Sequence, residues 1–232
     1  MHWKEKYRSL YYLDAEIPDV SLDPEHSALL VIDIQNTYVE RPSREALPEA
    51  EHRAWDLWTP FHTRMRKVVI PNTRRLLDTF RAHGADVFHA RIACLTPDGR
   101  DRSLSQRRPG FNNLLLPKDE HASQIVPELA PLPGEVVVTK TTDSALTGTN
   151  LRLVMQNMDV RHVVVAGIFT DQCVASTVRS LADESFDVVV VDDACAAATD
   201  ALHEQELTIL NNIYCQVMSR DDVLGELGWA SA

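Results

Sequence analysis

Six short apolar runs, most of them rich in valine and isoleucine, recur along the chain and limit the folds that it can adopt. Strands that are buried on both faces read as nearly unbroken apolar runs, whereas a strand with one wet face alternates apolar and polar residues. We therefore predict six buried strands, at 28–35, 86–92, 135–140, 162–169, 187–194 and 215–219.

Amphipathic helical patterns separate these runs. One helix is predicted to begin near Pro71 and to end at Gly84, with a face made of Val69, Thr73, Leu76, Leu77 and Phe80. A second helix follows 162–169, and a third, near the C-terminus, is marked by Leu202, Ile209, Leu210 and Ile213. Strands that alternate with helices form parallel βαβ units. We expect an α/β protein with one domain over 1–232, a three-layer α/β/α sandwich around a mostly parallel, six-stranded, Rossmann-like sheet.

Three segments fall outside this alternation. Residues 1–26 form an N-terminal extension, 40–67 is an insertion with prolines and aromatic residues, and 96–118 is rich in arginine. The last two follow predicted strands at the carboxyl edge of the sheet, where ligands bind in such folds. Each is therefore a lid over a pocket, a contact between subunits, or a surface loop without a role in the site.

The charge and cysteine content exclude several classes of partner. The formal net charge of −11 argues against nucleic acid and against an anionic membrane. No apolar stretch approaches the ~18 residues of a membrane-spanning helix, and the N-terminus lacks the apolar core of a signal peptide. The four cysteines form no C-x-x-C pair, which is typical of free thiols in a reducing compartment. We therefore expect a cytoplasmic protein that does not span a membrane.

Three polar residues close the carboxyl ends of predicted strands: Asp33, Lys140 and Cys173. Each has an ordinary interpretation, as a helix cap, a solvated charge and a small buried side chain respectively. Together, an acid, an ammonium and a thiol at one edge supply what nucleophilic acyl transfer needs. Cys173 falls in the first turn of a predicted helix. The helix dipole and Lys140 are expected to lower the pKa of its thiol, although Asp171 opposes this effect.

The sequence around these residues resembles the isochorismatase-like cysteine hydrolases, a family that includes nicotinamidases, N-carbamoylsarcosine amidases, and ureidoacrylate and biuret amidohydrolases. Three blocks carry the resemblance: "ALLVIDIQNTY", "EVVVTKTTDSALTGTNL" and "VVVAGIFTDQCVASTVRSLADESFDVVVVDDACAA". The resemblance implies a catalytic triad of Asp33, Lys140 and Cys173. It also implies an oxyanion hole made by the backbone N–H groups of Phe169 and Cys173, with a cis peptide bond between Ile168 and Phe169.

The function implied by the resemblance is hydrolysis of a C–N bond in a small amide or ureide, with release of ammonia or an amine. Asp33 would remove the thiol proton, Cys173 would attack the carbonyl carbon, and water would hydrolyse the resulting thioester. Lys140 would keep Asp33 ionised. Members of the family often form homodimers or homotetramers, so one of these assemblies is expected.

No metal or other cofactor is expected. Nicotinamidases of this family bind a metal through an Asp-x-His pair and a further histidine near the first block, but the residues after Asp33, "IQNTYVERPS", contain no such pair. The segment from Asp119 to His121 has the spacing but lies far along the chain, and we interpret it as an exposed cluster. His89, on the second predicted strand, is a candidate pocket residue without a metal.

Four side chains are candidates for substrate binding. Gln35 and Tyr38 follow the first predicted strand, and Arg91 lies on the second. Asn212 precedes the last strand, where a carboxamide can read a ureide or amide group. Each has an alternative role: a bond to the backbone for Gln35 and Arg91, packing for Tyr38, and the end of a helix for Asn212. The arginines at 100–108 can bind a substrate carboxylate or pair with acidic groups.

Two other functions belong to the same family. Isochorismatases share the fold but cleave a vinyl ether by acid catalysis without a thiol nucleophile, so Cys173 favours C–N hydrolysis. A non-catalytic member that acts as an interaction module would be expected to have lost one of the triad residues, and all are present. Hydride and phosphoryl transfer lack support, because the chain has no G-x-G-x-x-G, Walker A or G-x-S-x-G motif.

Overall fold

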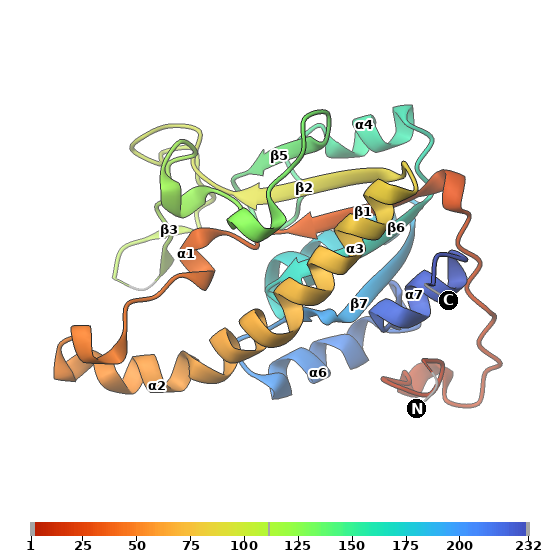
Figure 1. Cartoon of the computed structure of the whole chain (residues 1–232), viewed down its shortest axis with the longest axis horizontal. Coiled ribbons are helices and arrows are strands. Elements are labelled where there is room, and N and C mark those ends of the chain that lie inside the picture. The colour runs from red at the N-terminus through yellow and green to blue at the C-terminus, as the bar shows by residue number, and fades with distance from the viewer. Residues whose placement is uncertain (1–2, 111, 231–232) are drawn as a thin grey trace.

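A six-stranded, all-parallel sheet forms the centre of the structure, a computed structural model that describes residues 3–110 and 112–230. The strands are β1 (Ser27–Ile32), β2 (Asp86–Ile92), β5 (Val136–Lys140), β6 (His162–Ile168), β7 (Asp187–Ala196) and β8 (Gln216–Met218). Their order in the sheet is β5-β2-β1-β6-β7-β8 (Figure 1). All six predicted strands are confirmed, and each predicted end lies within about three residues of the observed one.

Helices cover both faces of this sheet, so the predicted three-layer sandwich is confirmed (Figure 1). One face carries α3 (Ile70–Ala82) and α7 (Arg220–Glu226), and the other carries α4 (Leu151–Asn157), α5 (Ala175–Asp183) and α6 (Asp200–Leu210). Strand β1 contributes Leu29 to the first layer of core and Leu30 to the second. Burial on both faces explains why its sequence is an unbroken apolar run.

The insertion at 40–67 is mostly helical. The short helix α1 (Asn36–Val39) leads into it, α2 (Glu49–Arg64) occupies most of it, and the π-turn Met65–Val69 joins α2 to α3. All of α2 is described, and Phe61 is its one buried residue, which fits a helix that extends away from the sheet (Figure 1). Among the described helices, none combines the length and apolar character that crossing a bilayer requires.

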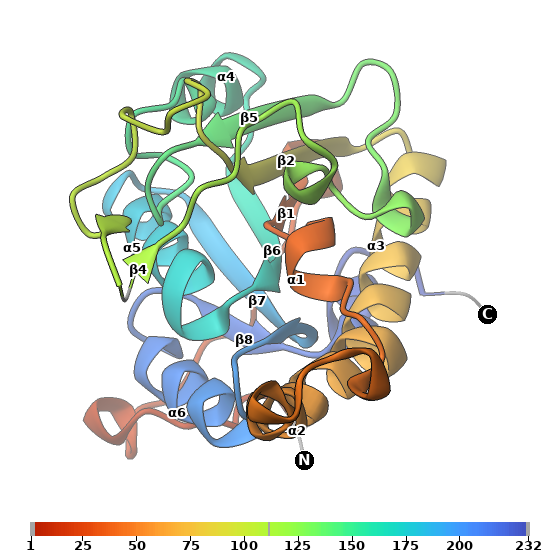
Figure 2. The same cartoon turned by 90° about the vertical axis from the view of Figure 1, so that its left-hand side faces the viewer.

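Segment 96–118 consists of loops and a short antiparallel pair, β3 (Arg107–Arg108) with β4 (Asn112–Asn113). Like α1, it lies at the end of the molecule toward which the sheet strands point (Figure 2). Both long segments therefore gather at the carboxyl edge of the sheet, as the chain order of strands and insertions predicts.

Helix α6 forms where it is predicted, but of the four residues that mark it in the sequence only Leu210 is buried. Its buried residues are His203, Leu207 and Leu210. Three of the four residues that mark the helix in the sequence are at least 40% exposed: Leu202, Ile209 and Ile213. The pattern is misleading because a buried histidine takes the place of an apolar residue on the packed face.

The side of the sheet on which successive strands are added reverses between β1 and β6. After β1 it adds β2 and β5 on one side, and after β6 it adds β7 and β8 on the other. In doubly wound sheets, the crevice at the carboxyl ends of such a pair of strands is the usual ligand site. Gly167 lets the two strands approach closely, because a Cβ at this position would lie 2.1 Å from the carbonyl oxygen of Ile32. The fold therefore directs attention to the residues that follow β1 and β6.

Candidate active site

Asp33 is the first residue after β1 at the carboxyl edge. Its φ of 55° lies in the left-handed region, which aspartate tolerates better than most residues, and its N–H donates to the carbonyl oxygen of Ala90. The turn directs the side chain into the interior, where the residue is 2% exposed. Its Oδ1 atom has no hydrogen-bond partner among the described residues. An ionisable oxygen is therefore available at the crevice between β1 and β6.

Lys140 is the last residue of β5 and is fully buried, although β2 separates β5 from β1. Its Nζ atom lies 2.7 Å from Asp33 Oδ2. It also donates a hydrogen bond of 3.2 Å to Cys173 Sγ and one of 3.2 Å to the carbonyl oxygen of Thr142. A buried ammonium persists only with such partners. One cation therefore joins the acid to the thiol.

Cys173 lies in the π-turn Thr170–Val174, which connects β6 to α5. The carbonyl oxygen of Phe169 accepts from the N–H of Val174 at 3.1 Å and closes this turn. The peptide bond between Ile168 and Phe169 is cis, as the resemblance implies. The turn leaves Cys173 6% exposed, with its sulfur toward Lys140. The structure thus brings together all three triad residues, which are distant in sequence.

Burial decides how protons are distributed in the triad. Burial raises the pKa of Asp33, although the charge of Lys140 opposes this shift. Burial also raises the pKa of the Cys173 thiol; the Asp33 carboxylate adds to the increase and Lys140 opposes it. Burial would lower the pKa of Lys140, but the charges of Asp33 and Cys173 more than offset it, so that pKa is raised.

This direction is opposite to the lowered thiol pKa expected from the sequence, because the helix-start position of Cys173 does not reveal the burial of its sulfur. A thiol with a raised pKa carries its proton at neutral pH. At rest, the triad therefore holds a protonated thiol beside an ion pair of carboxylate and ammonium, so the thiol needs a base before it can act as a nucleophile.

Aromatic side chains pack around Phe169. The ring centroids of Tyr38, Trp58 and Phe61 lie 5.5, 6.1 and 5.1 Å from that of Phe169. Trp58 and Phe61 belong to α2, so the insertion contacts the residue that precedes the turn Thr170–Val174. Trp58 is 42% exposed. Helix α2 therefore forms part of the surroundings of the triad and presents an aromatic face to solvent there.

A hydrogen-bond chain that sequence reasoning missed contacts the turn Thr170–Val174. His203 Nδ1 lies 2.8 Å from Thr170 Oγ1, and Arg64 Nη2 donates to His203 Nε2 at 2.9 Å. Because Nε2 accepts, the ring is neutral with its proton on Nδ1. Burial and the charge of Arg64 lower the pKa of His203 to about 3. The one available signal was a histidine inside the apolar pattern of α6.

Two of the predicted substrate-binding residues are engaged by neighbouring groups. Gln35 is fully buried; it donates to the carbonyl oxygens of Ile92 and Ser123 at 2.9 and 2.8 Å, and accepts from the N–H of Ile92 at 3.0 Å. Both of its N–H donors are thus used within the protein. Arg91 donates to Gln124 Oε1 at 2.7 Å. Gln35 therefore bonds to the backbone at Ile92 and Ser123 and is not free to bind a substrate with its N–H groups. A bond to the backbone is the alternative role considered for it from the sequence.

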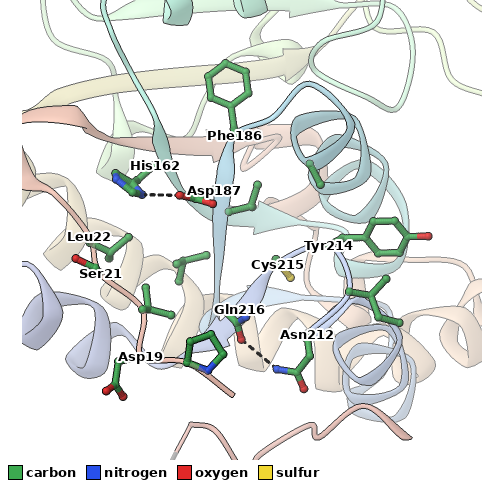
Figure 3. Close-up of a pocket in the computed structure, with 16 residues that line it drawn as sticks. Asp19, Ser21, Leu22, His162, Phe186, Asp187, Asn212, Tyr214, Cys215 and Gln216 are labelled. Carbon is green, nitrogen blue, oxygen red and sulfur yellow. Dashed lines mark hydrogen bonds and ion pairs between the residues drawn. The ribbon is translucent and has the colours of Figure 1, made fainter. Parts of the chain in front are cut away.

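Asn212 lies at the opposite edge of the sheet from the triad. It precedes β8 and donates to Gln216 Oε1 at 3.1 Å. It lines a hollow of ≈ 460 Å³ together with His162 and Asp187, the first residues of β6 and β7. Figure 3 shows these residues around the hollow. The structure does not bring Asn212 to the triad, because a residue before a parallel strand lies at its amino end while the triad residues stand at carboxyl ends.

The histidines considered as pocket or metal residues have carboxylate partners. His121 is largely exposed and its Nε2 lies 3.0 Å from Glu40 Oε1. His89 is buried, and its Nε2 lies 3.0 Å from Glu135 Oε2, a carboxylate that Arg81 of α3 also contacts. Within residues 3–110 and 112–230, no three His, Cys, Asp or Glu side chains form a group that could hold a metal ion.

Comparisons with known proteins find similarity to a family model and to individual relatives. The family model described as "Isochorismatase domain" matches residues 27–222. A ureidoacrylate amidohydrolase of Agrobacterium fabrum is 27% identical over 94% of this chain and 97% of its own length. An N-carbamoylsarcosine amidase of an Arthrobacter species is 28% identical over 72% of this chain and 66% of its own.

Solved structures agree with the sequence matches. An isochorismatase family protein of Burkholderia thailandensis superposes with a TM-score of 0.72 and 27% identity, over 90% of this chain and 98% of its own. The family model spans all six strands of the sheet and every triad residue. This chain belongs to the isochorismatase family of hydrolases.

Proposed function

We propose that this hydrolase is a cysteine amidohydrolase, which cleaves a C–N bond of a small amide or ureide through a thioester on Cys173. The observation that carries the proposal is the buried ammonium of Lys140, 2.7 Å from the carboxylate of Asp33 and 3.2 Å from the sulfur of Cys173. Acid-catalysed cleavage of a vinyl ether needs no thiol in this position. The names of the two relatives also describe amide and ureide hydrolysis.

The first chemical step is a proton transfer inside the triad. Asp33 takes the thiol proton of Cys173; burial raises the pKa of the carboxyl group and makes it a stronger base, although the raised pKa of the thiol opposes the transfer. The negative charge then moves from the carboxylate to the sulfur. Because Lys140 contacts both groups, this charge keeps the same counter-ion throughout the transfer. The nucleophile forms without leaving an unpaired charge in the interior.

The thiolate then attacks the amide carbonyl carbon, and the carbonyl oxygen becomes an oxyanion. We assign the oxyanion hole to the backbone N–H groups of Phe169, which directly precedes the turn Thr170–Val174, and of Cys173, which lies within it. The protonated Asp33 gives its proton to the leaving nitrogen, and ammonia or an amine departs. A water molecule, activated by the same carboxylate, hydrolyses the thioester and restores the free thiol.

Ammonia release tests this proposal. Wild type, Cys173→Ala and Cys215→Ala are compared on biuret, ureidoacrylate, N-carbamoylsarcosine, maleamate and nicotinamide. Cys215 is the matched control, since it is also a buried free thiol but lies next to β8, away from the triad. The proposal expects turnover by wild type and by Cys215→Ala, and none by Cys173→Ala. Turnover by Cys173→Ala at the wild-type rate would exclude the thioester route.

A further inference from the structure

A second carboxylate, Asp143, faces the sulfur of Cys173 in addition to that of Asp33. It lies three residues after Lys140, in the loop that follows β5, and its side chain is exposed. Its Oδ1 atom is 3.9 Å from Cys173 Sγ. The sequence contained this signal, an acidic residue within the block that carries the catalytic lysine, but gave no indication that its side chain turns back to the thiol.

The position of Asp143 is fixed from the other side by segment 96–118. Gln106 is 4% exposed, and its Nε2 donates to Asp143 Oδ1 at 3.3 Å. The loops are also joined through the backbone, since the N–H of Ser103 donates to the carbonyl oxygen of Thr141 at 3.3 Å. A buried amide thus holds an exposed carboxylate in place, which is the arrangement expected of a residue that meets a ligand.

Asp143 adds a carboxylate beside the thiol that forms no ion pair with the described residues. Among the ion pairs of the described residues, Lys140 is matched by Asp33, and none includes Asp143. Burial raises the pKa of Tyr38, which borders Phe169, and the negative charges of Asp33 and Asp143 add to the increase. The field at the entrance to the triad is therefore negative.

The arginines of segment 96–118 do not reverse this field. Arg100, Arg102, Arg107 and Arg108 line a separate hollow that excludes Asp143 and Gln106. The guanidinium of Arg102 donates to the carbonyl oxygens of Gly99, Gln106 and Leu114, so it is engaged in holding the loop. A substrate carboxylate beside the thiol would face Asp143 without one of these arginines as a partner.

We propose that Asp143 contacts the substrate and selects amides or ureides whose group next to the scissile bond is neutral or cationic and donates N–H, against those that carry a carboxylate there. This inference rests on the amidohydrolase function proposed above. Attack requires the carbonyl carbon to lie about 3–3.5 Å from the sulfur, so the adjoining atoms of the substrate reach the carboxylate of Asp143. Ureidoacrylate and N-carbamoylsarcosine are both carboxylates, so this chain prefers different substrates from those that name its two relatives.

A charge series of ureas measures this selectivity. 2-Aminoethylurea, n-propylurea and 3-ureidopropionate have similar lengths and differ in charge from positive to neutral to negative. For wild type, kcat/KM is expected to fall in that order. In Asp143→Asn the ratio between the cationic and anionic ureas is expected to drop by about tenfold or more, mainly through KM, with little change for the neutral urea. Glu16→Gln, which removes an exposed acid from the N-terminal extension, is expected to keep the wild-type ratio.

The outcomes distinguish a specificity residue from a catalytic one. An equal loss of kcat on all three ureas in Asp143→Asn would mean that the carboxylate acts on the thiol instead of the substrate, and would overturn the proposal. A wild-type ratio in Asp143→Asn would also overturn it. Asparagine has nearly the same shape and can still bond to Gln106, so a folding defect is not the expected result.

A thiol-labelling experiment separates this inference from the proposed function. Cationic 2-(trimethylammonium)ethyl methanethiosulfonate and anionic 2-sulfonatoethyl methanethiosulfonate both modify thiols, and Cys173→Ala gives the background of the other cysteines. The cationic reagent is expected to label Cys173 faster, with a rate ratio that drops about tenfold in Asp143→Asn. An unchanged ratio would refute the role of Asp143 even if ureas are hydrolysed. If wild type hydrolyses none of the ureas and amides, while the labelling-rate ratio still drops in Asp143→Asn, the amidohydrolase function is refuted instead.

Discussion

Replacing Lys140 with methionine should destabilise the fold as well as stop the reaction. Asp33 and Lys140 are 2% and 0% exposed, with 2.7 Å between carboxylate oxygen and ammonium nitrogen. At that separation and an effective dielectric constant near 20, the gross attraction is about 6 kcal/mol. The variant no longer has to bury an ammonium, which offsets part of this loss. Breaking one side of a buried ion pair costs about 3–5 kcal/mol in all.

The loss should depend on pH with a defined sign. Without Lys140, burial raises the pKa of Asp33 further above the unfolded value. The folded state then binds a proton that the unfolded state gives up as pH rises above about 4, so the stability of Lys140→Met falls from acidic to neutral pH. The double variant Asp33→Asn, Lys140→Met removes the stranded charge. It should recover most of the lost stability and remain inactive.

Urea denaturation followed by circular dichroism at pH 5 and pH 7 measures these changes. The reasoning expects the single variant to be less stable than the double variant at pH 7, and expects the difference to shrink at pH 5. Wild-type stability in Lys140→Met at pH 7 would refute it, and so would a double variant less stable than the single one, because neither is compatible with a buried carboxylate that needs its ammonium.

Other consequences follow from buried polar groups outside the triad. His203, with its pKa lowered to about 3, is protonated only in the unfolded state between pH 7 and 5, so wild type should lose about 2 kcal/mol more than His203→Gln over that range; equal pH slopes in urea denaturation would contradict this. Cys195, with a pKa raised to about 12, stays protonated in the folded state while the unfolded thiol ionises, so between pH 9 and 10 wild type should lose about 1 kcal/mol more than Cys195→Ala. The same loss in both proteins would argue against it. Gln35→Leu leaves the N–H of Ile92 and the carbonyl oxygen of Ser123 without partners and should lower the unfolding free energy by about 2–4 kcal/mol. A melting curve like that of wild type would show that these bonds are dispensable.

The strands and the residues at their ends were predictable because they depend on local patterns. A strand buried on both faces leaves an unbroken apolar run, and a polar residue directly after such a run in a parallel sheet stands at the carboxyl edge. This placed Asp33, Lys140 and Cys173 at one edge. The order of the strands in the sheet could not be predicted from the sequence. Only the structure shows that β2 lies between β5 and β1, and that Lys140 at the end of β5 still reaches Asp33 after β1.

The sequence does not reveal the direction in which a side chain points after its helix or strand ends, and the remaining features of the site depend on this direction. Asn212 was a candidate for substrate binding because it is a polar residue next to a predicted strand, but a residue before a parallel strand and one after it lie at opposite ends of that strand. The thiol of Cys173 was expected to be acidic because a helix start is visible in sequence, whereas burial, the larger effect on its pKa, is not. Asp143 approaches the sulfur through a loop turn that leaves no periodic pattern.

The central claim is that Cys173 carries the acyl group during turnover. Wild-type enzyme mixed with excess of the most rapidly hydrolysed amide or ureide, quenched in acid within one turnover and digested, should yield a peptide containing Cys173 with the added mass of the acyl group. The adduct should disappear when the peptide is treated with hydroxylamine, which cleaves thioesters. The account would be contradicted if Cys173→Ala still hydrolysed the substrate without forming an adduct. An acyl group on a different residue of the wild-type enzyme would contradict it as well.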